Sequence, residues 1–295
     1  MQKNSLVPKV QFPRLVQILS LVSLMAGVLW LSACSNSSGS GGPGAGSAEA
    51  PASDQSKALA EDVAKKYGAL DTSNDSTQKL KVTIKDDSGA AKAVDLVIYN
   101  KRKADGSRSM FVEFDSPAEE RDRDALIEVD PKGNVQATRY TQSSKSFLTA
   151  KSPTDEESLF GMTLQELVGG QPEKYGYTLL GEDTHNGTPV YKLEGKLKAG
   201  VESRFPRIVM LIDKQNYAAE VIEAYDSQNQ LARRITADKT EQVDGIWTRM
   251  NYQIDNIADK KTMNFAATSV KYNQNLPDSV FDRDHLKKLA TKTEG

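Results

Sequence analysis

Residues 207–237 read RIVMLIDKQNYAAEVIEAYDSQNQLARRITA, a pattern that predicts three β-strands joined by two short polar turns. Ile208, Met210 and Ile212 share one face, because successive side chains of a strand point to opposite faces. Both turns contain Asp and Asn, which hydrogen-bond to their own backbone and tolerate left-handed dihedral angles. We therefore expect an antiparallel meander here, and no catalytic motif lies near it.

Similar alternating stretches, separated by turn signals, run through most of the chain. They lie at residues 80–84, 94–98, 110–114, 125–129, 135–140, 146–149, 175–180, 190–197, 246–254 and 262–272. Asn186 and Gly187 give the strongest hairpin signal. Trp247 falls on the polar face of its strand with Arg249, where we expect it to pack under a neighbour. The chain is thus predicted to be mainly β (α+β), with one strongly curved antiparallel sheet of about 10–11 strands.

Two segments replace the strand alternation with helical spacing. Residues 53–70 predict an amphipathic helix laid over the sheet, with a partner-binding helix as the alternative. Residues 152–171 predict a short apolar helix between strands, which ends at Gly169 and Gly170. Such a helix would cover the inside of a curled sheet. Whether it is a fixed core plug or a movable lid over a ligand cavity stays open.

The first 34 residues have the layout of a bacterial lipoprotein signal. Three basic residues and no acidic ones precede Cys34, and the apolar run at residues 15–33 ends in Leu-Ser-Ala-Cys. These last four residues resemble the lipobox, whose Cys carries the lipid and becomes the mature N-terminus. The run is long enough to span a bilayer, so a retained transmembrane helix is the alternative. We predict a signal peptide at residues 1–33 and lipidation of Cys34, the only cysteine.

The next stretch is rich in Ser, Gly, Ala and Pro and lacks the apolar bulk that a core requires. Residues 34–52 are therefore expected to be the lipidated Cys and a flexible tether, and residues 53–295 a single domain. The tether has no Gly-Lys-Ser/Thr, so it does not match a phosphate-binding loop. Ser35 follows the Cys, and resemblance to Gram-negative lipoproteins then implies sorting to the outer membrane. We expect a lipid-anchored protein of the cell envelope on the periplasmic face of that membrane.

Charge and side-chain chemistry argue against several classes of function. Without the three basic residues that precede Cys34, the chain has 35 basic and 40 acidic residues. A nucleic acid partner would need a basic surface, so none is expected. His185 and His285 have no ligand partner at metal spacing, and no Gly-x-Ser-x-Gly occurs. We expect no metal, no cofactor and no catalytic residue; an unrecognised hydrolase is the remaining alternative.

Three stretches together form a recognisable pattern. They are LIDK at residues 211–214 with Tyr-Asp at 225–226 and Leu231, NLPDSVF at residues 275–281 with Leu286, and LFG at residues 159–161 with Glu-Leu at 166–167. The pattern resembles the LolA/LolB-like outer-membrane lipoprotein-sorting proteins over residues 53–289. The Ser-Asp-Phe that often follows the Gly in that family is missing here, as is a Tyr-x-Pro-like motif near Tyr140.

The resemblance implies an unclosed half-barrel with helices covering its concave face, whose inner surface binds acyl chains. The side chains that we expect to line this cavity are Met110, Val112, Phe114, Phe160, Met162, Leu164, Leu167, Met210, Ile222, Met250, Met263 and Phe265. The implied function is lipoprotein or lipid trafficking to the outer membrane, in the role of a membrane-bound acceptor. The alternative is a non-catalytic sensory or scaffold module that binds a membrane-protein partner of the envelope.

Overall fold

The computed structural model describes residues 54–151, 160–168 and 172–291. Contacts divide the chain into residues 1–49 and a second unit, residues 50–295, which contains every described element and is called the compact unit below. The predicted signal peptide, Cys34, the tether, Leu159 and the Gly169–Gly170 pair lie outside the described residues. In the part of the chain that is described, no helix combines the length and the apolar character needed to cross a membrane.

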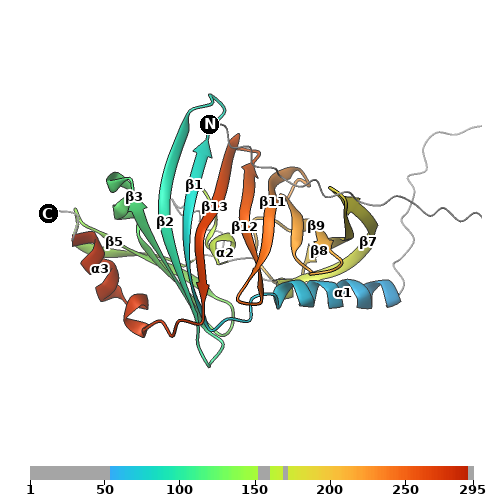
Figure 1. The fold of residues 1–295 in the computed structure, drawn as a ribbon, viewed down its shortest axis with the longest axis horizontal. Coiled ribbons are helices and arrows are strands. Elements are labelled where there is room, and N and C mark those ends of the chain that lie inside the picture. Colours follow the sequence, from blue (N-terminus) through green and yellow to red (C-terminus); the bar gives the residue numbers. More distant parts are fainter. Residues whose placement is uncertain (1–53, 152–159, 169–171, 292–295) are drawn as a thin grey trace, which may run out of the picture. The chain divides into compact units, whose positions relative to one another are not determined.

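The compact unit is built on one antiparallel sheet (Figure 1). Its strands are β1 (Asp75–Lys85), β2 (Ala91–Arg102), β3 (Arg108–Ser116), β4 (Ala125–Val129), β5 (Val135–Thr141), β6 (Ser146–Ala150), β7 (Tyr175–His185), β8 (Thr188–Leu197), β9 (Arg207–Asp213), β10 (Ala219–Tyr225), β11 (Leu231–Val243), β12 (Ile246–Asn256) and β13 (Lys261–Tyr272). The predicted curved antiparallel sheet is confirmed. The expected strand number was too low: among the described residues the sheet has 13 strands, because the alternating stretches at residues 135–140 and 146–149 also pair, as β5 and β6.

The sheet is a meander whose first and last strands meet in its middle. Consecutive strands pair except β6 and β7, which are the two edge strands, and β1 also pairs with β13, in the order β6-β5-β4-β3-β2-β1-β13-β12-β11-β10-β9-β8-β7. The hairpin predicted at Asn186 and Gly187 is present, and both residues have positive φ, as a two-residue turn of this kind requires. The three strands predicted within residues 207–237 are β9, β10 and β11.

Two helices pack on one face of the sheet, which we call the inner face. Helix α1 (Asp54–Gly68) packs through Ala60 and Val63 against the β7–β9 half. The other half forms a core around Val82 and Phe114, against which α2 (Leu164–Leu167) places the fully buried Leu164. Helices on the inner face are therefore confirmed for α1 and α2.

A third helix packs on the opposite, outer face. Helix α3 (Arg283–Thr291) buries Leu286 against Phe111, Leu126 and Tyr140, whose positions alternate with those of the inner-face residues on their strands. Short 3-10 turns at Ala118–Arg123, Pro172–Lys174 and Asp278–Phe281 complete the described elements. The helices expected on the concave face are therefore accompanied by a third helix on the opposite face.

Of the helix expected at residues 152–171, the structure describes residues 160–168. Within that stretch only Leu164–Leu167 is helical, and it begins with a capping box between Thr163 and Glu166. Phe160 and Gly161 have φ angles of 64° and 66°, a left-handed backbone that a right-handed helix excludes. The apolar side chains of this segment therefore reach the inner face from an irregular loop as well as from a helix.

Candidate functional site: an apolar cavity on the inner face

A cavity of about 430 Å³ lies between the inner face and the segments that cover it. Strands β2, β3 and β9–β13, the end of α1 and residues 160–168 all contribute side chains to its wall. Ligand pockets in proteins usually measure about 300–1,000 Å³, so the cavity has the size of a small-molecule site. Its wall is dominated by aliphatic, aromatic and methionine side chains.

Eight of the twelve predicted lining residues meet at this cavity: Met110, Val112, Phe160, Met162, Leu167, Met210, Ile222 and Phe265. The other four do not. Phe114, Leu164 and Met263 are buried in the core at 1%, 0% and 1% exposure and do not line the cavity. Met250 is half-buried and lies where the pairing of β11 with β12 is irregular.

Aromatic rings form one part of the wall. Tyr252 stacks on Phe265, with ring centroids 4.6 Å apart and an angle of 3° between the planes. Phe160 meets Phe265 edge-on at 5.7 Å. Burial raises the pKa of Tyr252 to about 12, so its hydroxyl is neutral at physiological pH. The result is a rigid, uncharged surface of the kind against which hydrocarbon packs well.

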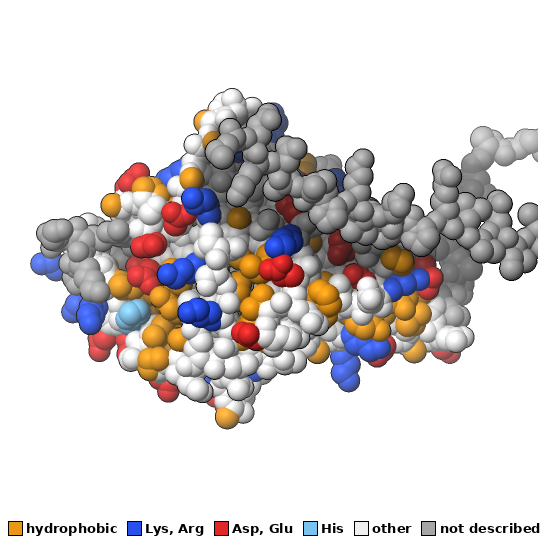
Figure 2. Space-filling model, viewed as in Figure 1, with side chains coloured by type: hydrophobic (Ala, Val, Ile, Leu, Met, Phe, Trp, Pro, Cys, Tyr) orange, Lys and Arg blue, Asp and Glu red, His pale blue; other side chains and the backbone are white. Residues whose placement is uncertain are grey.

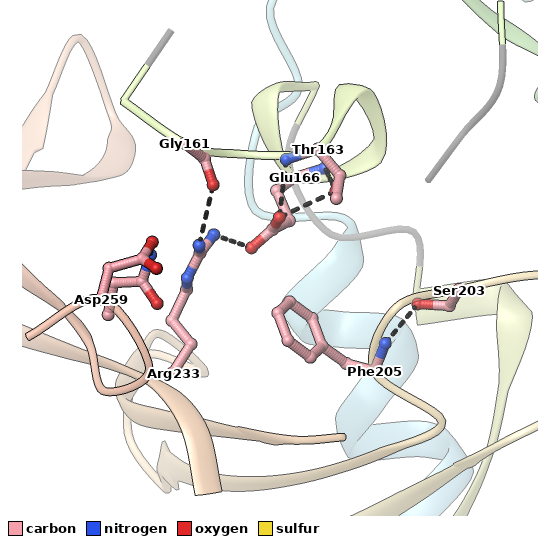
Figure 3. Close-up of polar contacts among 8 residues, drawn as sticks. Gly161, Thr163, Glu166, Ser203, Phe205, Arg233 and Asp259 are labelled. Carbon is pink, nitrogen blue, oxygen red and sulfur yellow. Dashed lines mark hydrogen bonds and ion pairs between the residues drawn. The ribbon is translucent and has the colours of Figure 1, made fainter. Parts of the chain in front are cut away.

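One buried cation interrupts the apolar wall. Arg233 of β11 is only 2% exposed and pairs with the carboxylate of Glu166, and its Nη2 donates to the carbonyl oxygen of Gly161 at 3.2 Å (Figure 3). Burial lowers the pKa of Arg233, and the charge of Glu166 opposes that shift. Glu166 also accepts from Thr163 N–H and Oγ1, each at 2.8 Å. Arg233 therefore ties the segment over the cavity to the sheet.

Trp247 and Arg249 also line the cavity, although strand alternation assigned them to the other face. Thr240 pairs with Arg249 and Lys239 with Asn251, so Met250 is an extra residue without a partner on β11. A bulge of this kind reverses which residues point inward beyond it. The sequence carries no signal for the bulge, because Met250 continues the alternation without interruption.

Neither histidine belongs to the cavity wall. His185 ends β7 at the hairpin turn, and His285 of α3 meets Phe111 edge-on at 5.0 Å on the outer face. Across the described ranges, no group of three or more His, Cys, Asp or Glu side chains could hold a metal ion. On the face shown in Figure 2, basic and acidic side chains are interspersed, so that face has no continuous basic surface.

A family model described as "Uncharacterized protein" matches residues 106–288, which is more than half of the chain. The chain belongs to that family. No curated protein matches the chain.

Solved structures show the same fold. A DUF1329 family protein from Desulfovibrio piger superimposes with a TM-score of 0.72 at 20% identity, covering 78% of this chain and 99% of that one. An outer membrane lipoprotein-sorting protein domain from Vibrio parahaemolyticus gives 0.71 at 19% identity, over 78% and 99%. A LolA superfamily protein from Nitrosomonas europaea gives 0.60 at 13%, over 77% and 98%. The chain therefore has the LolA-like half-barrel fold that the sequence motifs indicated, and identities this low extend the likeness no further than the fold.

Proposed function

We propose that this protein binds acyl chains in the inner-face cavity and takes part, without catalysis, in lipid or lipoprotein trafficking at the outer membrane. The observation that carries the proposal is the cavity itself, about 430 Å³ and walled mainly by apolar side chains. An apolar cavity of that size favours a hydrocarbon ligand, because burial of apolar surface is the main favourable term available there.

The composition of the wall supports a ligand of variable shape. Met110, Met162 and Met210 all line it, and methionine side chains adapt to irregular neighbours because they are unbranched and polarisable. Met162 and Leu167 lie on the segment that Arg233 ties to the sheet, so one side of the wall is held by a single loop and helical turn. A carrier needs such a side, since its ligand must enter and leave.

The membrane connection rests on the N-terminal sequence. We propose that residues 1–33 are removed, that Cys34 carries the lipid, that residues 34–52 form a tether, and that residues 53–295 are a single half-barrel domain. Each buried methylene contributes about 0.8 kcal/mol to anchoring, and more than one chain makes it stable. The domain would then work on the periplasmic face of the outer membrane. Replacing residues 1–34 by a cleavable signal peptide that has no lipobox should move the protein from the membrane fraction to the soluble fraction.

Native mass spectrometry of the compact unit, purified from a bacterial envelope without detergent, tests the cavity. We expect co-purifying lipid in the wild type. Leu167→Glu puts a charge into the cavity wall and should abolish the adduct, whereas Leu148→Glu should keep it, because Leu148 is 60% exposed on β6. Circular dichroism must show both variants folded. If only the mass of the unliganded protein is found after incubation with phospholipid vesicles or an acylated peptide, the proposal is wrong and a protein partner is favoured.

A further inference from the structure

The inner face changes from apolar to polar along three neighbouring strands. On β2 the inward residues run from Leu96 and Ile98 to Asn100 and then Arg102, and on β3 from Val112 through Met110 to Arg108. On β1, Leu80 is followed in the same direction by Gln78 and Ser76. The switch is staggered by one residue pair from each strand to the next, since Gln78 pairs with Ile98 and Asn100 with Met110, and it is complete at the pair Arg102–Arg108.

A polar pocket of about 140 Å³ lies at this level, next to the apolar cavity. Met110 and Asp71 line both spaces, so the two adjoin. Arg102 and Arg108 line the polar pocket and are directly opposite one another in the β2–β3 register. Like charges in directly opposed positions destabilise a sheet. A bound anion would relieve that repulsion.

The acidic side chains of the pocket, Asp71 and Asp75, accept hydrogen bonds from other groups and do not pair with the two arginines. Asp71 accepts from Ser73 N–H and Oγ at 2.9 and 2.6 Å, and Asp75 accepts from the backbone N–H groups of residues 274 and 276. Lys101 also lines the pocket and pairs with Asp278, which does not line it. Among the described residues, no carboxylate lies within ion-pair distance of Arg102 or Arg108; Arg102 donates only to the backbone oxygen of Asp71, at 3.1 Å.

A further cation lies at the same end of the sheet. Arg249 lines the apolar cavity with its guanidinium 5.4 Å from the ring of Tyr252, and it too has no carboxylate within ion-pair distance in the described ranges. The neighbouring Thr248 hydrogen-bonds through Oγ1 to the hydroxyl of Tyr272, at 2.8 Å, and Tyr272 pairs with Ser76 of β1. Polar side chains therefore continue from β1 across β13 to β12. Arginines lie at both ends of this row, Arg102 and Arg108 on β2 and β3 and Arg249 on β12.

We propose that the ligand is an anionic amphiphile, whose phosphate or carboxylate binds Arg102 and Arg108 while its hydrocarbon chain fills the adjoining cavity. This rests on the proposed function and names its substrate class. Guanidinium groups suit the role, because their planar forks bind carboxylate and phosphate through paired, charge-assisted hydrogen bonds. Arg102 is exposed and Arg108 half-buried, so an incoming headgroup can reach them without unfolding the sheet.

The test compares dodecyl phosphate, dodecanol and inorganic phosphate by isothermal titration of the compact unit. We expect dodecyl phosphate to bind about 10-fold or more tightly than dodecanol, since one charge-assisted hydrogen bond is worth about a factor of ten. The Arg102→Gln/Arg108→Gln variant should lose that preference and keep its affinity for dodecanol. The matched control Lys79→Gln/Lys81→Gln removes two charges from the exposed outer side of β1 and should behave as wild type.

Three results would overturn parts of this inference separately. Dodecanol binding as tightly as dodecyl phosphate to the wild type rejects the anionic headgroup and leaves the acyl-chain cavity standing. Inorganic phosphate binding as tightly as dodecyl phosphate assigns the arginines to a free anion instead. No binding of either amphiphile rejects the proposed function itself. If the arginine variant does not fold, the wild type can be titrated at several salt concentrations instead. Rising ionic strength should weaken the binding of dodecyl phosphate and leave the binding of dodecanol unchanged.

Discussion

Replacing Glu166 by Leu should destabilise the protein more than replacing Arg233 by Met, although both changes break the same ion pair. The two ends of the pair differ in burial and in their other partners. Arg233 is 2% exposed and, when the carboxylate is gone, keeps a hydrogen bond to the carbonyl oxygen of Gly161, the ring of Phe205 at 5.6 Å and the more distant charge of Asp259. Glu166 has 17% of its side chain exposed and keeps both hydrogen bonds from Thr163 when the guanidinium is gone.

The magnitudes follow from these partners. Leaving an unpaired buried charge costs about 3–5 kcal/mol, which applies to Glu166→Leu. Arg233→Met leaves a carboxylate that is still hydrogen-bonded and partly solvated, so we expect a loss of about 1–2 kcal/mol. The double variant has no buried charge and should lie within about 1 kcal/mol of wild type. For a domain of this size the Glu166 variant should melt roughly 6–20 °C lower.

Urea unfolding of the compact unit, followed by the fluorescence of Trp247, measures all three free energies. Glu166→Gln is the matched control, because it keeps the length of the side chain and can still cap the helix while losing the charge. It should fall near Glu166→Leu if the charge decides the outcome, and near wild type if capping does. Additive single effects, or a larger loss for Arg233→Met than for Glu166→Leu, would refute the reasoning.

Three further predictions follow from the same structure. The pKa of Tyr252 is about 12 in the folded state and 10.0 in the unfolded state, so the unfolded protein ionises first as the pH rises. The free energy of unfolding should keep its full value below pH 10 and fall by about 2 kcal/mol between pH 10 and 12. Tyr252→Phe should lack this fall, which urea unfolding at pH 11 measures. Deleting Met250 should remove the bulge and leave Trp247 facing the cavity, because Asn251 and Arg249 already pair with adjacent residues of β11; its emission maximum and acrylamide quenching should stay close to wild type, and a red shift would refute the assignment of the bulge. Gly195→Ala brings a methyl group to 2.8 Å from a neighbouring side chain and should cost about 1–3 kcal/mol, whereas Gly176→Ala meets nothing within 4 Å and is the control; equal melting temperatures would refute this.

Local patterns in the sequence predicted the fold well wherever local chemistry decides the structure. The turn at Asn186 and Gly187 and the helix at residues 54–68 depend on backbone preference and apolar spacing, which the sequence displays directly. The helix expected at residues 152–171 was largely wrong among the described residues. Apolar spacing there is also satisfied by a loop, because the left-handed backbone at Phe160 and Gly161 lets several side chains point the same way.

The site was predicted less completely, for two physical reasons. Alternation tells which residues of a strand point inward, but the curvature of the sheet and the depth of α2 decide whether an inward residue lines a space or is buried in the core. Phe114 and Met263 are buried in this way. The sequence also gave no indication of Arg233 as a buried cation, because its partner Glu166 lies 67 residues away and the two meet only after folding.

Bulges, more than composition, give the cavity its chemical polarity. Thr268 has no partner on β1, since Leu80 pairs with Ala267 and Lys79 with Ser269. Beyond this extra residue the faces exchange, and Tyr272 therefore lines the cavity although it is an odd number of residues from Phe265. The bulge at Met250 does the same for Trp247 and Arg249 on the adjacent strand. A perfectly regular β12 would turn the guanidinium of Arg249 away from the cavity. Variants that alter strand register should therefore change which ligands the half-barrel accepts, even where the apolar lining is untouched.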